Sequence, residues 1–356
     1  MKRKHNFNAG PSVLPLKVLE QAQRDLIDFK DSGVGILEMS HRTPLFEKLL
    51  HEIMEMVRKL LHVPSDYSIA LCTGGATNQF SMVPLNILGK REGNYLLTGI
   101  WAEKAFEEGK KFGQVHCVAS SKGDKWSFIP KQLKLSTDPA YLHFTSNNTI
   151  VGTQSHQEPE AGDIPLVCDA SSDIFSREIA IKKYGILYAG AQKNIGTAGV
   201  TLVIIRNDLL DRIPSGLPVL MDYRTYIKND SLYNTPPIFP YYIMHSMLTW
   251  MTEHGGVSYF QTRGREFARR LYNVIDSRPE VFTPCAKKED RSNTNITFFA
   301  KSPEAEAKLL AEAANQDIYG IRGHKIVGGI RISLYNAITD EAVSAVESLL
   351  CRFTPP

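Results

Sequence analysis

The sequence predicts an α/β protein, in which a large domain with a mostly parallel central sheet is followed by a smaller α+β domain. Short apolar segments alternate with helical patterns from residue 16 to about residue 260 of the 356-residue chain. Several of these segments, such as Val200–Ile205, are continuous apolar runs. Such runs are typical of strands that are buried on both faces, as they are in a parallel sheet. After residue 277 the pattern changes to two strand-like runs and two helical stretches.

Helices are expected where apolar residues recur at helical spacing. Leu19, Ala22, Leu26 and Phe29 predict a first helix that ends near Gly33. The pair Thr43-Pro44 is a typical helix start, because threonine caps free N–H groups and proline tolerates the first helical position. The helices expected after this first one cover residues 44–60, 76–88, 241–254, 257–277, 303–315 and 339–351.

Strands are expected in the short apolar runs between these helices. They cover residues 67–72, 95–97, 115–118, 141–144, 165–168, 186–189, 200–205, 295–299 and 330–334. A proline-rich segment at residues 234–240 interrupts the pattern before the helix at 241–254. We therefore predict a large domain over residues 16–260 and a small domain over residues 261–356, to which residues 1–15 also belong.

Composition excludes several classes of protein. Lysine and arginine number 41 against 38 aspartates and glutamates, which is not the clustered basic excess of a protein that binds nucleic acid or a membrane surface. No apolar run approaches the length of a membrane span, and no signal peptide is recognisable. The five cysteines are scattered without a CxxC pair, which favours the cytoplasm. The ten histidines show no HExxH or clustered spacing, so we expect no metal.

Polar residues that follow a predicted strand are the candidates for function, because ligands bind at the carboxyl ends of strands in open α/β sheets. Residues 73–77, Thr-Gly-Gly-Ala-Thr, follow one strand and begin a helix. Their glycines permit close approach of the backbone, and the free N–H groups of the helix start suit a phosphate. The alternative is a simple tight turn, because a Gly-Gly pair by itself is a weak signal.

Two charged residues follow the next candidate strands. Asp169 comes directly after an apolar run, where a carboxylate serves a ligand or caps the next segment. Lys193 stands in a turn of small residues between two buried strands. Partial burial lowers the pKa of an amine, and a neutral amine is what covalent bonding to an aldehyde cofactor requires. The alternative for Lys193 is a surface turn.

Together, a phosphate-binding turn, an acid at a strand end and a lysine 24 positions later describe a pyridoxal phosphate site. The phosphate binds at the helix start, the carboxylate keeps the ring nitrogen protonated, and the lysine holds the aldehyde. Trp101 is placed to stack on the ring, unless it is simply packed in the core. Two basic clusters, His41-Arg42 and His324-Lys325 with Arg331, suggest a substrate with more than one negative group.

These residues also lie in motifs that resemble the phosphoserine aminotransferase family, a class-V group of fold-type I pyridoxal phosphate enzymes. The resemblance covers essentially the whole chain and is most specific around Lys193. The motifs are Phe7-Asn8-Ala9-Gly10-Pro11, Met39-Ser40-His41-Arg42, Val83-Pro84-Leu85-Asn86, Tyr188-Ala189-Gly190-Ala191-Gln192-Lys193-Asn194-Ile195-Gly196, Asn234-Thr235-Pro236-Pro237 and Gly323-His324-Lys325-Ile326-Val327-Gly328-Gly329-Ile330-Arg331.

The resemblance implies a role for each candidate. Lys193 and Asp169 are implied to be catalytic, and Trp101 is implied to stack on the cofactor. The further implied cofactor contacts are Ala76, Thr77, Thr149, Gln192, Asn234 and Thr235, the last two reaching the site from the other subunit of a homodimer. The implied substrate contacts are His41, Arg42, Arg331, which binds the α-carboxylate, and His324, which reaches the phosphate across the interface.

The implied reaction is amino transfer in two stages from glutamate to 3-phosphooxypyruvate, which gives 2-oxoglutarate and O-phosphoserine for serine biosynthesis. A phosphorylated hydroxythreonine of vitamin B6 synthesis remains an alternative substrate. Some family members carry an arginine for the substrate phosphate where Thr77 stands, so that contact is expected from elsewhere. The rival interpretations are another fold-type I enzyme, such as a decarboxylase or a desulfurase that uses Cys285, and a binding protein without catalysis.

Overall fold

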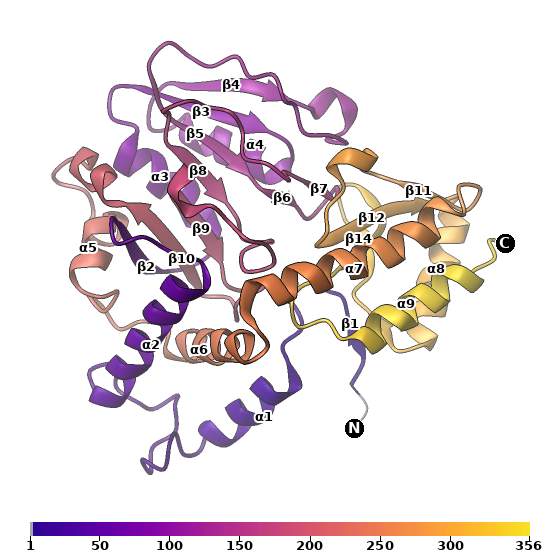
Figure 1. The fold of residues 1–356 in the computed structure, drawn as a ribbon, viewed down its shortest axis with the longest axis horizontal. Coiled ribbons are helices and arrows are strands. Elements are labelled where there is room, and N and C mark those ends of the chain that lie inside the picture. Colours follow the sequence, from indigo (N-terminus) through magenta and orange to yellow (C-terminus); the bar gives the residue numbers. More distant parts are fainter. Residues whose placement is uncertain (1–2) are drawn as a thin grey trace.

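The computed structural model describes residues 3–356 and has two lobes (Figure 1). The large lobe is built on a seven-stranded sheet, and the small lobe on a four-stranded sheet. The strand order of the large sheet is β2 (Tyr67–Thr73), β10 (Val200–Arg206), β9 (Tyr184–Gly190), β8 (Leu166–Asp169), β5 (Pro139–Thr145), β3 (Glu92–Leu97) and β4 (Val115–Ser120).

The large sheet is mostly parallel, as the sequence predicts. Five neighbouring strands, from β9 to β4, pair in parallel. Only β10 runs against the others, and it pairs antiparallel with both β9 and β2. The carboxyl ends of β2, β3, β5, β8 and β9 therefore meet at one edge of the sheet.

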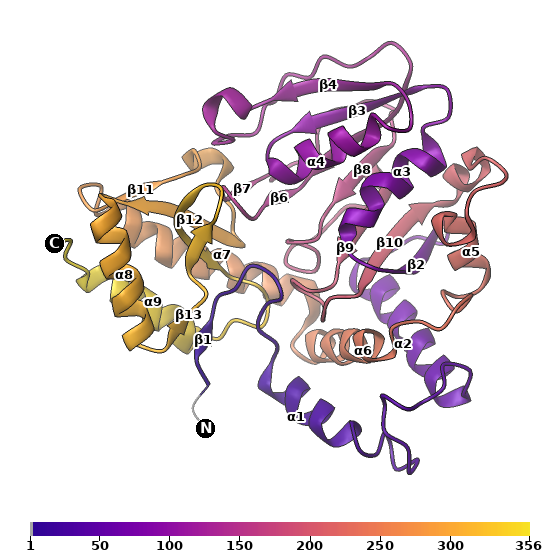
Figure 2. The same ribbon diagram turned by 180° about the vertical axis from the view of Figure 1, so that it is seen from behind.

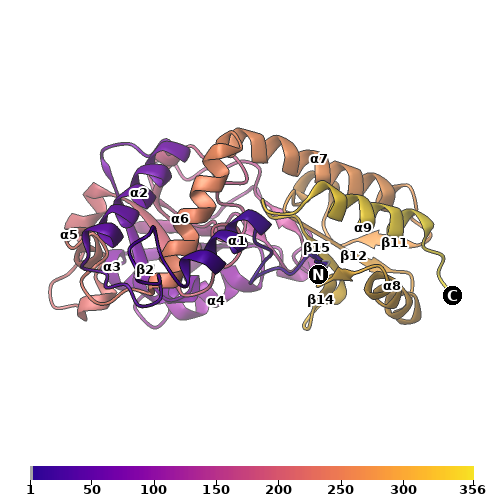
Figure 3. The same cartoon turned by 90° about the horizontal axis from the view of Figure 1, so that it is seen from below.

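Helices cover both faces of this sheet. Side chains alternate between the faces, so that Leu71 packs in one core while its neighbours Ala70 and Cys72 pack in the other. One core contains α2 (Pro44–Leu60) and α6 (Ile238–Glu253). The other contains α3 (Gln79–Ile87), α4 (Ile100–Gly109) and α5 (Tyr223–Lys228). Figure 3 shows α2 and α6 on the opposite side of the lobe from α4. Helices α4 and α5 lie outside the ranges predicted from the sequence.

The first helix is shorter than its apolar spacing predicts. Helix α1 (Leu16–Asp25) ends one turn before Phe29, which is nevertheless buried. The chain folds back on itself there, since the Ile36 N–H donates to the Asp25 carbonyl at 2.8 Å. Gly35 permits this turn, because a Cβ at that position would lie 2.1 Å from the Leu26 carbonyl oxygen. A tight reversal thus buries Phe29 without a helix.

The small lobe combines an antiparallel sheet with two helices. Its strands are β11 (Phe282–Pro284), β12 (Asn295–Ala300), β15 (Gly328–Ser333) and β14 (Arg322–His324), in that order. Helices α8 (Pro303–Asn315) and α9 (Asp340–Arg352) share its core with Phe7. The N-terminal strand β1 (His5–Asn6) pairs in parallel with β13 (Ile318–Tyr319), and Figure 2 shows this segment against the small lobe.

Helix α7 (Gly256–Asp276) connects the two lobes. The predicted domain boundary between residues 260 and 261 falls inside this helix, so the division at that position stays a prediction. A short hairpin, β6 (Asn147–Asn148) with β7 (Thr153–Gln154), lies between the two sheets. Among residues 3–356, no helix combines the length and apolar character that a membrane span needs.

The register of β12 predicts how much two neighbouring phenylalanines contribute to the stability of the small lobe. Phe298 is fully buried against Phe282, with ring centroids 5.2 Å apart, whereas its neighbour Phe299 is 36% exposed. We expect Phe298→Ala to lower the free energy of unfolding by about 3–5 kcal/mol, because it leaves a core cavity. The matched change Phe299→Ala should cost less than about 1 kcal/mol. Urea denaturation of both variants measures this, and equal losses would contradict the register.

Candidate active site

The predicted catalytic pair lies on neighbouring strand ends of the large sheet. Asp169 is the last residue of β8, and Lys193 stands in the turn that follows β9. The two strands are parallel, and Asp169 pairs in register with Tyr188. Because parallel strands end at the same edge, residues 24 positions apart in sequence are brought to one place.

The Lys193 side chain is half-buried and packs against the N-terminal segment. Gly10 of the N-terminal segment packs on it so closely that a Cβ there would lie 3.0 Å from the Lys193 Cγ. The Ser12 hydroxyl donates to the Lys193 carbonyl, and the Ser12 N–H donates to the Gln192 carbonyl at 3.0 Å. Burial lowers the pKa of the Lys193 amine below its usual value, while Asp169 acts in the opposite direction. Burial therefore favours the neutral amine.

Asp169 is held in place by backbone groups. It is 7% exposed, and its Oδ1 accepts a hydrogen bond from the Ser171 N–H at 3.0 Å. The Asp169 carbonyl accepts from the Ser146 N–H at 3.1 Å, which ties the end of β8 to the segment after β5. The carboxylate is thus fixed near the Lys193 amine and keeps an oxygen available for a ligand.

Trp101 lies beside the lysine. It stands in the first turn of α4, which follows β3, and the Lys193 Nζ lies 6.0 Å from the centre of its ring. The indole Nε1 is buried and makes no hydrogen bond within the described part of the chain. A flat aromatic face, a primary amine and a carboxylate therefore border the same space.

The predicted phosphate-binding turn lies next to the lysine turn. A 3₁₀ turn, Ala76–Asn78, precedes α3, and its N-cap is Gly75, which offers no side chain to the first N–H groups. A Cβ at Gly190 would lie 2.8 Å from the Gln192 Oε1 and 3.3 Å from the Ala76 Cβ. Ala76 and Gln192 are therefore neighbours, and Thr77 follows in the same turn.

Arg331 connects the small lobe to this site. It lies on β15, and its Nη1 donates to the carbonyl of Thr149 at 3.2 Å. Its Nε is buried without a hydrogen-bond partner in residues 3–356. Burial lowers the pKa of His324, on β14, and the charge of Arg331 acts in the same direction. Within one chain, Arg331 and His324 thus belong to the same positive region.

Four predicted residues are not brought to the lysine within one chain. Within residues 3–356, neither His41 nor Arg42 makes a hydrogen bond or ion pair with Lys193, and both lie in the loop before α2. In the described part of the chain, the Asn234 side chain bonds to its neighbour, its Nδ2 donating to the Thr235 carbonyl at 3.3 Å. All four lie in loops and are half-buried or exposed.

The structure also adds residues that sequence reasoning missed. Asp173 is fully buried, and its carboxylate accepts hydrogen bonds from Ser146, Gln154 and Arg177. Asp173 also opposes the lowering of the Lys193 pKa. The signal in the sequence was an aspartate four residues before an arginine, a spacing that suits an ion pair. The contact of Gly10 with Lys193 carried no local signal.

The site fits the expected cofactor, pyridoxal phosphate. A buried amine whose neutral form is favoured stands beside a carboxylate and an indole ring, and the Gly75 turn offers backbone N–H groups to a phosphate. The unpartnered Trp101 Nε1 and Gln192 Oε1 are buried polar atoms that a ligand would satisfy. Within the described residues, no group of three or more acidic, histidine or cysteine side chains is arranged to hold a metal.

Comparisons with known proteins agree with this geometry. Residues 4–346 match the family model described as aminotransferase class-V. A phosphoserine aminotransferase of Geobacillus kaustophilus is 46% identical over 356 residues, and 99% of each chain is covered. The solved phosphoserine aminotransferase from Bacillus circulans subsp. alkalophilus is 41% identical, with a TM-score of 0.97 and 99% of each chain covered.

A more distant structure is also similar. The pyridoxal phosphate-bound phosphoserine aminotransferase from Trichomonas vaginalis is 37% identical, with a TM-score of 0.94, and covers 98% of this chain and 99% of its own. Likeness at this level extends over both lobes and the segment that joins them. The fold, the site and the match over residues 4–346 lead to one conclusion: the chain belongs to the class-V aminotransferase family.

Proposed function

We propose that this chain is an aminotransferase that moves an amino group from glutamate to 3-phosphooxypyruvate and so produces O-phosphoserine and 2-oxoglutarate. The observation that carries this proposal is the enclosed Lys193 amine beside Asp169 and Trp101. The similar proteins from Geobacillus kaustophilus and Bacillus circulans are both phosphoserine aminotransferases. A phosphorylated hydroxythreonine remains a second substrate to be tested.

Pyridoxal phosphate, when bound, supplies an electron sink for the negative charge that appears when a proton leaves the α-carbon of the amino acid. The Asp169 carboxylate would hold a proton on the ring nitrogen of the bound cofactor. The Lys193 Nζ, which burial favours in the neutral form, accepts the α-proton and then donates it, as a general base followed by a general acid. The N–H groups of the turn at Ala76 and Thr77 would hold the phosphate of the cofactor.

Positive groups bind the substrate. Arg331, anchored through the Thr149 carbonyl, keeps its Nε free to bind a carboxylate. His324 lies near the charge of Arg331 and is well placed for the second anionic group. His41 and Arg42 are the further contacts that we propose for the substrate anion. In this arrangement His41, Arg42 and His324 make the phosphate contact that some family members take from an arginine at the position of Thr77.

We further propose that the enzyme is a homodimer with shared active sites and that it resides in the cytoplasm. Large exposed apolar side chains stand next to both segments predicted to reach the other subunit. Tyr233, beside Asn234, is 51% exposed, and Ile326, near His324, is 63% exposed. Exposed apolar surface beside a segment with a predicted function supports the presence of a second subunit that covers it. The five cysteines are free, which supports a reducing compartment.

The alternative of a cysteine desulfurase is not favoured. Such an enzyme needs a reactive thiolate, and Cys285 is the only cysteine that the sequence places in a polar loop. Burial raises the pKa of the Cys285 thiol to about 11, so the thiolate is scarce at neutral pH.

A substrate comparison tests the proposed reaction. We expect kcat/KM for 3-phosphooxypyruvate, with glutamate as donor, to exceed that for 3-hydroxypyruvate by at least about tenfold. The reason is that each hydrogen bond lost from a charged phosphate is worth about 1.5–3 kcal/mol. A coupled assay of 2-oxoglutarate release measures both rates on the purified enzyme. Equal values would remove the case for a phosphate-binding pocket.

Substitution of the lysine tests the catalytic role. We expect Lys193→Ala to lower kcat by about 10²- to 10⁴-fold or more, the size of a general acid–base contribution. Lys182→Ala, at an exposed lysine in the same lobe, is the control and should leave kcat unchanged. Full activity of the Lys193→Ala enzyme would exclude the proposed mechanism.

Hybrid dimers test whether the active sites are shared. Homodimers of Lys193→Ala and of the double variant Asn234→Ala/Thr235→Ala should each be impaired, the second mainly in cofactor affinity. A hybrid of the two chains contains one site whose lysine and Asn234–Thr235 segment are both intact, if these come from different subunits. We expect the hybrid to regain about half of the wild-type activity and of the tight cofactor binding by titration. Absence of recovery would mean that each site is built from one chain.

A further inference from the structure

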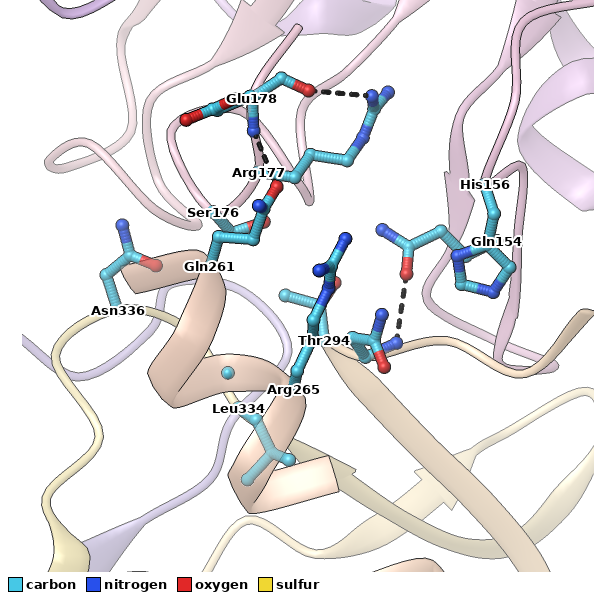
Figure 4. Close-up of a pocket in the computed structure, with 12 residues that line it drawn as sticks. Gln154, His156, Ser176, Arg177, Glu178, Gln261, Arg265, Thr294, Leu334 and Asn336 are labelled. Carbon is cyan, nitrogen blue, oxygen red and sulfur yellow. Dashed lines mark hydrogen bonds between the residues drawn. The ribbon is translucent and has the colours of Figure 1, made fainter. Parts of the chain in front are cut away.

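A polar cavity of about 110 Å³ lies between the two lobes. Its walls come from the segments around Gln154 and Arg177 in the large lobe, from α7, and from the small-lobe chain near Thr294. Figure 4 shows these side chains around a common space. The cavity has several times the room that one ordered water needs. Lys193, Asp169, Trp101 and Arg331 are not among the residues that line it.

Two guanidinium groups border this cavity. The Nε of Arg177 donates to the buried Asp173 at 2.8 Å, and the Arg177 side chain is only 16% exposed. Arg265 projects from α7 toward Arg177 and Gln154 (Figure 4) and makes no hydrogen bond or ion pair with any residue from 3 to 356. Asp173 offsets the charge of Arg177, whereas Arg265 is exposed on α7 and has no counter-ion among residues 3–356.

Neutral groups in the wall add hydrogen-bond donors. Thr294 is 2% exposed, lines the cavity, and its Oγ1 is buried without a partner in the described chain. A buried hydroxyl without a partner is uncommon and calls for a ligand or an ordered water. Gln261 accepts from the Glu178 N–H through its Oε1 at 2.9 Å, which leaves its amide N–H groups available.

Two acceptors at the cavity wall, the Gln154 oxygen and the Glu178 carboxylate, are engaged or directed away from Arg265. The Gln154 Oε1 already accepts from the Asn293 N–H at 2.9 Å, and the Gln154 Nε2 donates to Asp173 at 3.2 Å. Glu178 is exposed, and Figure 4 shows its side chain directed away from Arg265. A cavity with unused donors and an unpaired cation suits an anion.

We propose that this cavity binds a small oxyanion, a phosphate or carboxylate group, between Arg177, Arg265 and Thr294. Guanidinium groups match both kinds of oxyanion in geometry and charge. Arg177 belongs to the large lobe, whereas Arg265 and Thr294 lie on α7 and in the small lobe. The bound anion therefore bridges the lobes and stabilises their arrangement.

The proposed anion site lies close to the turn that carries Lys193 but does not include residues of that turn. Asn336, which also lines the cavity, donates its N–H to the Asn194 Oδ1 at 2.9 Å, and Asn194 follows Lys193. The anion site thus supports the wall behind the lysine turn. It is separate from the proposed amino transfer, so either proposal can fail alone.

Anion-dependent stability of the cofactor-loaded enzyme tests the site. The melting temperature is measured against inorganic phosphate at constant ionic strength, with chloride as the balancing anion. A ligand that binds only the folded state stabilises it by RT ln(1 + L/Kd), where L is the free ligand concentration. The melting temperature therefore rises with phosphate concentration in a way that reports the dissociation constant. We expect Arg265→Gln to raise the apparent dissociation constant for phosphate, obtained from the melting temperatures, at least tenfold. The reason is that the substitution removes the unpaired cation.

Arg269→Gln is the matched control. It makes the same charge change one turn further along α7, where Arg269 pairs with Glu266 and is 61% exposed. Any phosphate bound at the active site contributes equally in both variants, because neither residue belongs to that site. Arg269→Gln should respond to phosphate as the wild type does. Equal responses of Arg265→Gln and Arg269→Gln would overturn the proposal.

A second variant and a second anion complete the test. Thr294→Val keeps the volume of the side chain and should weaken the phosphate effect, as calorimetric titration of the loaded enzyme would measure. The same measurement with malonate in place of phosphate distinguishes a carboxylate site from a phosphate site. A response to one anion assigns its class, and similar responses that both depend on Arg265 assign a general oxyanion site. A response to chloride alone would overturn the proposal.

Discussion

The opposition between burial and charge at Lys193 is the constraint on which the rest of the site depends. Enclosure removes water from the amine and favours its neutral form, whereas the carboxylates of Asp169 and Asp173 favour the charged form. Neither carboxylate is mobile, because backbone and side-chain donors hold both. An amine balanced in this way is able both to accept a proton and to return it, which amino transfer requires.

Polar contacts between the lobes maintain this balance. The Asn147 Nδ2 donates to the Asn295 Oδ1 at 2.7 Å, and the Thr297 hydroxyl donates to the Val151 carbonyl at 2.7 Å. The Tyr335 hydroxyl, from the small lobe, donates to the carbonyl of Ala9, next to the glycine that packs on Lys193. Because these groups are buried, a shift between the lobes would leave several of them without partners. The lobe arrangement is therefore part of the active site, and an anion in the polar cavity would strengthen it.

Within one chain, several of the predicted site residues do not meet at the lysine. Arg331 reaches the lysine region from the small lobe, whereas His41, Arg42 and the Asn234–Thr235 segment remain in loops. Exposed apolar side chains accompany these segments, and a second subunit that covers them would bring its own loops to the site.

The sequence by itself determined the elements that depend on local patterns. Continuous apolar runs predicted the buried strands, and the Thr43-Pro44 pair predicted the start of α2. The positions of Asp169 and Lys193 after predicted strands made them candidates for the site. Tertiary structure decided what depends on distant contacts. The early end of α1, the packing of Gly10 on Lys193 and the polar cavity all come from segments far apart in the chain. Periodicity reports which face of an element is buried, but it does not report which other segment covers that face.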